Sequence, residues 1–483
     1  MRTEMRSTTS TDRRRPGRLR RLGVVSAVAV SAAGLAGGAV AAPAPTGAAT
    51  TIATPVHHAY VVKMIDTGSQ GNTYPETDAQ LLAHVDKALD FWVDQTDQAI
   101  SSFTRAGNLP TITGDCTSST VKSDSWAAGK ALFPGVTFGG TTGNHMIVLA
   151  PAGCAYPSVA TTGSLANGLN SGGNVFVYDN PQIIDISLTH ELGHNFSFNH
   201  ANALVCSTTN GTTTCPEADY QNRYSVMSLA LSSPAGSPPY LPPALSSYAR
   251  DRVGVLKTCE VPSVSLGTGQ HDVTATYDVW GRGSKNGTRG IKVVDPTTGD
   301  TYFLDYRDGS GRDAASYYRM ASATGYNSGV TVEKVKPLSG GNTQPVLQPI
   351  TQDTTWRQYA LWDQETFTVG GLTVRTGPYA YAGDPSQVTV TLTNPSGTNT
   401  TLPTQQGTAT VTGTPTAGQT LTANPTNWTA GSCHRYQWLD NGVPIKRARN
   451  ATFTVPANPA GHVYTVQITG QQSGYQPLTA TSL

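Results

Sequence analysis

Charged residues are scarce in this sequence, and neither sign is in excess. Asp, Glu, Lys and Arg make up 13% of the 483 residues, and the formal net charge is +1. A protein that holds nucleic acid or an anionic membrane through a broad electrostatic field carries a large excess of positive charge. We therefore expect neither of these partners.

An apolar run long enough to span a membrane is also missing. The apolar stretch at about residues 23–35 is shorter than the roughly 20 residues that a spanning helix needs. It follows a basic region at residues 1–22 and precedes Ala39-Val40-Ala41, as in a signal peptide with its cleavage site. We predict a signal peptide over residues 1–41, a short N-terminal extension over 42–56, and no membrane span.

Cysteines are few, and no Cys-x-x-Cys zinc knuckle is present. The chain has 6 cysteines, and an even number in an exported protein predicts disulfides. We expect Cys206–Cys215 as a local staple and Cys116–Cys154 as a second bridge. Cys259 and Cys433 lie in different predicted domains, and the sequence assigns no partner to either.

Histidines, in contrast, are concentrated in residues 190–200, which read HELGHNFSFNH. Two histidines four apart lie on one face of a helix, so His190 and His194 can bind one metal ion together. Glu191 lies one step around the helix, where its carboxylate reaches a water held on that metal. His200 offers a third nitrogen. Three protein ligands and one open position are typical of catalytic Zn²⁺, so the spacing predicts a zinc site with Glu191 as general base.

This extended pattern resembles the metzincin zinc endopeptidases, whose motif HExxHxxGxxH is followed by a turn containing methionine. Residues 224–228, YSVMS, are similar to that turn, which implies that Met227 forms an apolar floor beneath the metal. Within the family, HELGHNF is most similar to the gametolysin-like group. The resemblance implies peptide-bond hydrolysis by a zinc-bound water, with a protein or peptide substrate lying along an edge strand near residues 163–168. A loop is the alternative for this segment.

One position departs from the family pattern, because Ser197 stands where metzincins have glycine. Glycine lets the chain leave the helix with a positive φ, so that the third histidine can return to the metal. A serine in that conformation costs about 1–2 kcal/mol. Asn195 or Asn199, which tolerate the left-handed region, are the alternatives for this turn.

Two further features bear on the metal site. Glu217 and Asp219 are the alternative ligands if His200 does not reach the metal. Some metzincins also place a tyrosine two residues after the methionine of the turn. Leu229 occupies that position here, so the resemblance offers no such helper.

The predicted fold of residues 57–260 is α+β, a twisted sheet with long helices. Strands are expected at residues 60–65, 145–150 and 174–178, and a helix from Thr77, with a Thr77/Gln80 capping box, to about residue 103. The helix carrying the histidine motif should begin near Asp185, and a last helix should cover residues 244–256. His145 is expected to be a framework histidine.

The remaining sequence predicts all-β domains. Short alternating strands over residues 261–394 indicate a β-sandwich, and residues 395–406 read as a linker. Residues 407–483 resemble immunoglobulin-like modules of actinobacterial secreted proteins, with Trp438 in the core. The turn at residues 308–313 could hold a structural Ca²⁺ through Asp308 and Asp313, although a surface turn is the favoured interpretation.

The hypothesis from the sequence is a secreted, extracellular zinc endopeptidase of bacterial, actinobacterial type, acting as a monomer. Two alternatives remain open: a zinc hydrolase acting on a non-peptide bond, and an adhesin that uses the same fold. An intact Glu191 argues against a catalytically idle fold. The natural substrate, the activation route and any surface ligand of the C-terminal domains are not predicted.

Overall fold

The computed structural model describes residues 56–106, 108–154, 157–209, 212–234, 236–266, 269–285, 287–320, 326–350, 358–398 and 402–483. The predicted signal peptide, and all but the last residue of the predicted N-terminal extension, lie outside the described residues. No described helix is long and apolar enough to cross a membrane.

A mostly parallel sheet organises the first part of the chain. Its order is β2-β1-β4-β6-β5, with β3 also paired to β1, and only β5 runs antiparallel to its neighbour. The predicted strands at residues 60–65, 145–150 and 174–178 are confirmed within β1, β4 and β6. The bounds are β1 (Val56–Asp66), β2 (Ser102–Ala106), β3 (Thr111–Gly114), β4 (Asn144–Ala150), β5 (Val159–Ala160) and β6 (Gly173–Tyr178).

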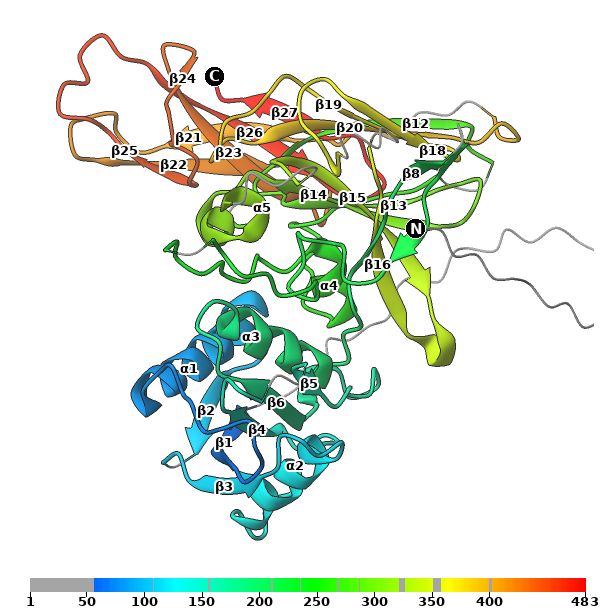
Figure 1. Cartoon of the computed structure of the whole chain (residues 1–483). Helices are drawn as coiled ribbons and strands as arrows, with labels where there is room; N and C mark the ends of the chain where they lie inside the picture. The colour runs from blue at the N-terminus through cyan, green and yellow to red at the C-terminus, as the bar shows by residue number, and fades with distance from the viewer. Residues whose placement is uncertain are drawn as a thin grey trace, which may run out of the picture. The chain divides into compact units, whose positions relative to one another are not determined.

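Helices cover both faces of this sheet, because successive strand residues point to opposite sides. Helices α1 (Asp78–Gln95) and α3 (Ile184–Asn195) pack against the face that includes Val61, while α2 (Val121–Ala131) packs against the face that includes Val62 (Figure 1). The two resulting apolar cores hold α3 firmly against the sheet.

Helix α1 is shorter than predicted. Its Thr77/Gln80 capping box is confirmed, but the helix ends at Gln95, where Asp97 and Gln98 take positive φ values of 50° and 62°. The prediction ran to about residue 103 because apolar residues beyond the true end, such as Phe103 of β2, still pack against the same core. The expected helix at residues 244–256 is likewise reduced to α4 (Ser247–Arg252), capped by the Ser246 side chain.

The second part of the chain is built from two facing sheets. One has the order β10-β7-β16-β15-β14-β13-β11 with β17 on β15, the other the order β12-β20-β19-β18, and both contribute to one apolar core. Strands β7 and β10 come from before residue 260, so the larger sheet crosses the predicted domain boundary. The bounds are β7 (Asn202–Leu204), β10 (Glu217–Ala218), β11 (Ser263–Val264), β12 (Asp272–Val279), β13 (Gly290–Val294), β14 (Thr301–Arg307), β15 (Gly329–Pro337), β16 (Thr343–Leu347), β17 (Ala360–Leu361), β18 (Thr366–Val369), β19 (Leu372–Thr376) and β20 (Ser386–Thr393).

The C-terminal residues form a second pair of sheets around Trp438, which is fully buried as predicted. Within the preceding segment, predicted as a linker, Leu402 and Gln405 are buried. The bounds of these strands are β21 (Thr408–Thr412), β22 (Thr420–Thr426), β23 (Cys433–Asp440), β24 (Val443–Pro444), β25 (Thr452–Thr454), β26 (Tyr464–Gln471) and β27 (Leu478–Thr481).

Three disulfides join the six cysteines. Cys206–Cys215 and Cys116–Cys154 are confirmed, and Cys259 pairs with Cys433 across a sequence separation of 174 residues. The first of these closes a hairpin of β8 (Ser207–Thr209) and β9 (Thr212–Thr214). The remaining short helices are η1 (Gly168–Asn170), η2 (Gly311–Ala315), α5 (Tyr317–Met320) and η3 (Ser339–Gly341).

Candidate metal centre

Helix α3 carries the histidine motif and is almost entirely buried. Asp185, expected at the start of the helix, lies in its first turn, where its negative charge suits the positive end of the helix dipole. Its carboxylate accepts hydrogen bonds from His84 and, at 3.3 Å, from Lys87. These contacts tie the start of α3 to α1.

Close packing around Gly193 brings the methionine turn against α3. A Cβ atom at Gly193 would lie 2.5 Å from Sδ of Met227 and 3.1 Å from Cζ2 of Trp92, so only glycine fits there. Trp92 also donates through Nε1 to the carbonyl of Thr189 at 3.1 Å. The helix is therefore held between α1 and the turn that contains Met227.

The three motif histidines converge. His190, His194 and His200 each offer a ring nitrogen within 4.8 Å of the others, close enough to hold one metal ion. Nε2 of His190 lies 3.1 Å from Nε2 of His194, and the ring centroids of His194 and His200 are 5.1 Å apart. No other group of three or more His, Cys, Asp or Glu side chains within the described residues meets this criterion.

Each of these rings is oriented through its second nitrogen. Nδ1 of His190 lies 3.0 Å from the carbonyl of Val226, and Nδ1 of His194 lies 2.8 Å from that of Phe198. Nδ1 of His200 lies 3.1 Å from a carboxylate oxygen of Asp219. Because these partners only accept hydrogen bonds, each Nδ1 carries the proton and each Nε2 is left as a free ligand atom.

The two residues considered as alternative ligands have other roles. Asp219 orients His200 and does not replace it. Glu217 accepts from Asn202 at 2.7 Å and pairs with Lys336 at 2.7 Å. Neither belongs to the group that can hold the metal.

Burial keeps two of the ligand rings neutral. Loss of solvent lowers the pKa of His190 to about 3 and that of His194 to about 4, and the neighbouring histidines act in the same direction. Neutral imidazole is the form that binds a metal, so little proton release is needed before an ion can enter.

Ser197 itself takes the conformation that the family assigns to glycine, with φ of 70°. Neither asparagine replaces it in this role. The Ser197 carbonyl accepts from Nη2 of Arg252 at 2.5 Å, and its Oγ lies 3.3 Å from the same nitrogen. The guanidinium of Arg252 thus braces the turn that returns the chain to His200 and offsets part of the strain.

Glu191 is buried beside the histidines, with 5% of its surface exposed. Burial raises its pKa to about 8, opposed by the positive charge of Lys122. One carboxylate oxygen, Oε2, has no hydrogen-bond partner among the described residues. A buried carboxylate with an unpaired oxygen is chemically suited to accept a proton from a substrate group or a water.

Tyr220 was missed by the sequence analysis. Its ring centroid lies 3.6 Å from that of His200 and 6.0 Å from that of His190, and its backbone is strained, with φ of 60°. The backbone N–H donates to Asn202 and the carbonyl accepts from Ser228 and Arg223, which holds the residue against the methionine turn. The phenol therefore stands next to the candidate ligands from outside the motif.

A signal for this placement does exist in the sequence. The pairs Leu204↔Glu217 and Ser207↔Thr214 follow the same antiparallel register as the disulfide Cys206–Cys215. Extending that register from the disulfide brings Tyr220 opposite Ala201, next to His200. The expected staple therefore already implied a tyrosine at the site.

The loop alternative for residues 163–168 is confirmed, and the edge strand lies earlier in the chain. Residues 163–168 form a loop that ends in η1, and the antiparallel edge strand is β5, paired through Val159↔Phe176. The loop nevertheless contacts the metal helix, because the Gly163 N–H donates to the carbonyl of His194 at 2.8 Å. A Cβ at Gly163 would lie 1.9 Å from the Asn195 carbonyl oxygen, so glycine permits this approach.

The turn at residues 308–313 reaches the surface at Gly311 and Arg312, in agreement with the favoured interpretation, but its two carboxylates do not. Asp308 accepts from the N–H groups of Ser310 and Gly383, and Asp313 accepts from Ala244, Arg307 and Tyr318. Both carboxylates are buried. They brace the loop through protein hydrogen bonds, and they are not among the residues grouped closely enough to hold a metal.

Comparison with protein-family models finds no family that matches the chain, and a search of curated proteins finds no match either.

Proposed function

We propose that this chain is a secreted zinc endopeptidase of the metzincin type, with an immunoglobulin-like module at its C-terminus. The observation that carries the proposal is the convergence of one ring nitrogen from each of three histidines beside a buried glutamate. The three disulfides fit the predicted export into an oxidising compartment.

The donor set fits zinc. Three imidazoles, each with its Nδ1 bound to a carbonyl or a carboxylate, are the usual protein ligands of catalytic Zn²⁺, and they leave room for a further ligand. A zinc ion bound there would supply a Lewis acid that activates water and polarises a peptide carbonyl.

Glu191 is the proposed general base and acid. It accepts the proton of the attacking water and later donates that proton to the leaving amine. A cation held by the three histidines favours the ionised carboxylate, which offsets the effect of burial. The unpaired Oε2 of Glu191 is the atom available for this transfer.

Tyr220 is the proposed hydrogen-bond donor to the oxygen on which negative charge develops. The contact of its ring with that of His200 supports this role, because a donor next to the metal ligands can reach such an oxygen. This role is the one that some metzincins give to a tyrosine after the methionine turn.

The substrate is proposed to pair with β5. A strand at the edge of a sheet has free N–H and C=O groups that bind an extended peptide whatever its side chains. Strand β5 is followed by the loop that contacts the end of α3, which links the peptide-binding edge to the metal helix.

The proposal is tested by casein cleavage with purified wild-type protein and Glu191→Ala, with zinc measured on both. We expect both proteins to hold zinc and the variant to lose at least about 10²-fold in kcat/KM, the usual effect of losing a general base. If both hold zinc and neither cleaves casein, the adhesin and non-peptide hydrolase hypotheses replace the peptidase.

Tyr220→Phe separates the role of the phenol from that of the ring. The variant keeps the aromatic contact with His200 but lacks the O–H, and we expect kcat to fall by about 10²-fold with little change in KM. Zinc content should be unchanged. An unaltered kcat would remove Tyr220 from the mechanism and leave the rest of the proposal standing.

A further inference from the structure

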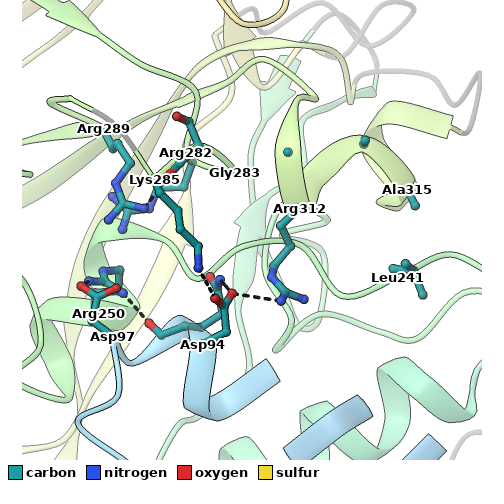
Figure 2. A pocket seen from close by; sticks show the side chains of 14 residues that line it. Asp94, Asp97, Leu241, Arg250, Arg282, Gly283, Lys285, Arg289, Arg312 and Ala315 are labelled. Atoms are coloured by element: carbon teal, nitrogen blue, oxygen red, sulfur yellow. Dashed lines mark hydrogen bonds and ion pairs between the residues drawn. The ribbon is translucent and has the colours of Figure 1, made fainter. Parts of the chain in front are cut away.

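A cavity lies where the end of α1 meets α4 and the loops around β13 and β14. Its volume is about 510 Å³, and neither Glu191 nor any of the three histidines lines it (Figure 2). Five of its lining residues are cationic, and two are anionic. The cations are Arg250, Arg282, Lys285, Arg289 and Arg312, and the anions are Asp94 and Asp97.

Asp94 occupies the open side of this cavity and is shared by two cations. Lys285 and Arg312 reach it from opposite sides, with contacts of 2.5 Å and 3.0 Å (Figure 2). The Lys285 side chain is 78% exposed, and Arg312 is 32% exposed. Within the part of the chain that the structure describes, Asp94 is the only carboxylate paired with the Arg312 guanidinium, which has five N–H donors.

The inner side of the cavity repeats this arrangement with buried groups. Glu260 pairs with Arg250 at 3.0 Å, with Arg289 at 2.9 Å and also with Arg282. Asp97 pairs with Arg250 at 2.6 Å. Arg250 and Arg282 are 2% and 1% exposed, so their positions are fixed by the fold.

Positive charge exceeds negative charge in this cluster. Lys257 also pairs with Asp97, and Asp305 lies 3.8 Å from Arg282. Six cations therefore face four carboxylates, those of Asp94, Asp97, Glu260 and Asp305, which leaves an excess of two positive charges. Burial and the neighbouring Arg282 lower the pKa of Arg289 to about 10, the direction expected where cations crowd together. A bound anion would reduce the repulsion between these cations.

We propose that this cavity is a binding site for a small dianionic oxyanion, of the phosphate or dicarboxylate class. The N–H groups of an arginine guanidinium bind two oxygens of a phosphate or a carboxylate at once, and the excess of two positive charges matches a dianion. Lys285, Arg289 and Arg312 contact the anion, while Arg250 and Arg282 form the fixed positive floor. The site is independent of the proposed peptidase chemistry.

The test is calorimetric titration of the full chain with sulfate, phosphate and malonate, at an ionic strength held constant with sodium chloride. We expect saturable binding of at least one dianion, and the phosphate and malonate arms show which chemistry the site prefers. Repeating the titration after chelation of bound metal separates this site from an anion bound to zinc.

Three variants decide whether the cavity is responsible. Lys285→Gln with Arg312→Gln should lower the affinity at least about tenfold, because two charge-assisted contacts are lost. Lys285→Gln alone should give a smaller loss of affinity. Because this side chain is exposed, the single variant should fold even if the double variant does not. The exposed Lys446→Gln, in the C-terminal domain, is the matched control and should bind like wild type.

Asp94→Asn provides a test with the opposite sign. It removes the carboxylate that competes for Lys285 and Arg312, so the affinity for the dianion should rise several-fold. A cluster that serves only to join elements would show no such gain. Absence of saturable binding by all three dianions, or binding that the double variant retains in full, would overturn the proposal.

Discussion

Two groups of histidines touch helix α3, and they differ in what surrounds their ring nitrogens. His57 and His145 are fully buried, and Nδ1 of His57 lies 2.9 Å from Nε2 of His145. Nδ1 of His145 in turn lies 2.8 Å from Oδ1 of Asn195, the last residue of the helix. At the metal centre, His190 is 6% exposed, and His194 and His200 are more accessible.

Whether a histidine can act as a ligand depends on whether one of its ring nitrogens is left without a protein partner. The His145 ring has both nitrogens in contact with protein groups, and Phe196 and Phe103 pack around it, so no ligand atom remains. In His190, His194 and His200, each Nδ1 contacts a protein acceptor, and one ring nitrogen of each lies within 4.8 Å of the others. The expectation that His145 belongs to the framework agrees with this arrangement.

The largest expected effect comes from His145→Ala. It leaves a nitrogen of His57 and Oδ1 of Asn195 unpaired beside a new cavity, so the free energy of unfolding should fall by about 2–4 kcal/mol. Urea denaturation measures the change, and zinc content should stay the same. His58→Ala, on the same strand but half-buried, is the control and should cost less than about 1 kcal/mol. A loss of zinc at unchanged stability would contradict the assignment of His145 to the framework.

Asp219→Ala is expected to weaken the metal centre without destroying it. Removing the partner that orients His200 should lower zinc affinity about 10- to 100-fold, as measured by competition with a chelator. Glu217→Ala is the matched control, because that carboxylate pairs with Asn202 and Lys336 instead. Equal effects of the two variants would contradict the orienting role of Asp219.

Acid should destabilise the buried pair. Burial lowers the pKa of His57 to about 4 and that of His145 to about 3, below their ordinary value of 6.5. Between these limits the unfolded chain binds more protons, so the stability contributed above pH 6.5 is lost as the pH falls toward 4. Because the unfolded chain takes up these protons, each histidine should lower the free energy of unfolding by about 2 kcal/mol between pH 6.5 and 5. Denaturation of wild type and His145→Ala at both pH values measures this, and identical pH slopes would contradict it.

The smallest expected change is a gain. Ser197→Gly removes the strain of a serine at positive φ and should raise the free energy of unfolding by up to about 1 kcal/mol, with zinc affinity unchanged. Thermal unfolding of the metal-free proteins is the measurement. A destabilised variant would mean that the contact of the Ser197 hydroxyl with Arg252 outweighs the strain.

Local patterns predicted much of this molecule, because they are set by short-range geometry. The spacing of His190 and His194, the capping box at Thr77 and the buried core strands all follow from short-range patterns within one element. The end of α1 could not be read in this way, since Phe103 lies on the next strand and still faces the same core.

Features that depend on distant partners were beyond the sequence pattern. The edge strand β5 has only two paired residues and no periodicity of its own, so its position depends on β6. The Cys259–Cys433 bridge requires two regions predicted as separate domains to meet. Tyr220 is an exception, because the antiparallel register that includes Cys206–Cys215 places it next to His200.

The most direct test of the account is the zinc content of the purified chain, measured by mass spectrometry after dialysis. Wild type and His145→Asn should each carry one zinc ion per chain, and His194→Ala should carry almost none. Zinc retained in His194→Ala, or a wild-type chain that takes up no zinc from a zinc-containing buffer, would contradict the assignment of the three histidines as the metal centre.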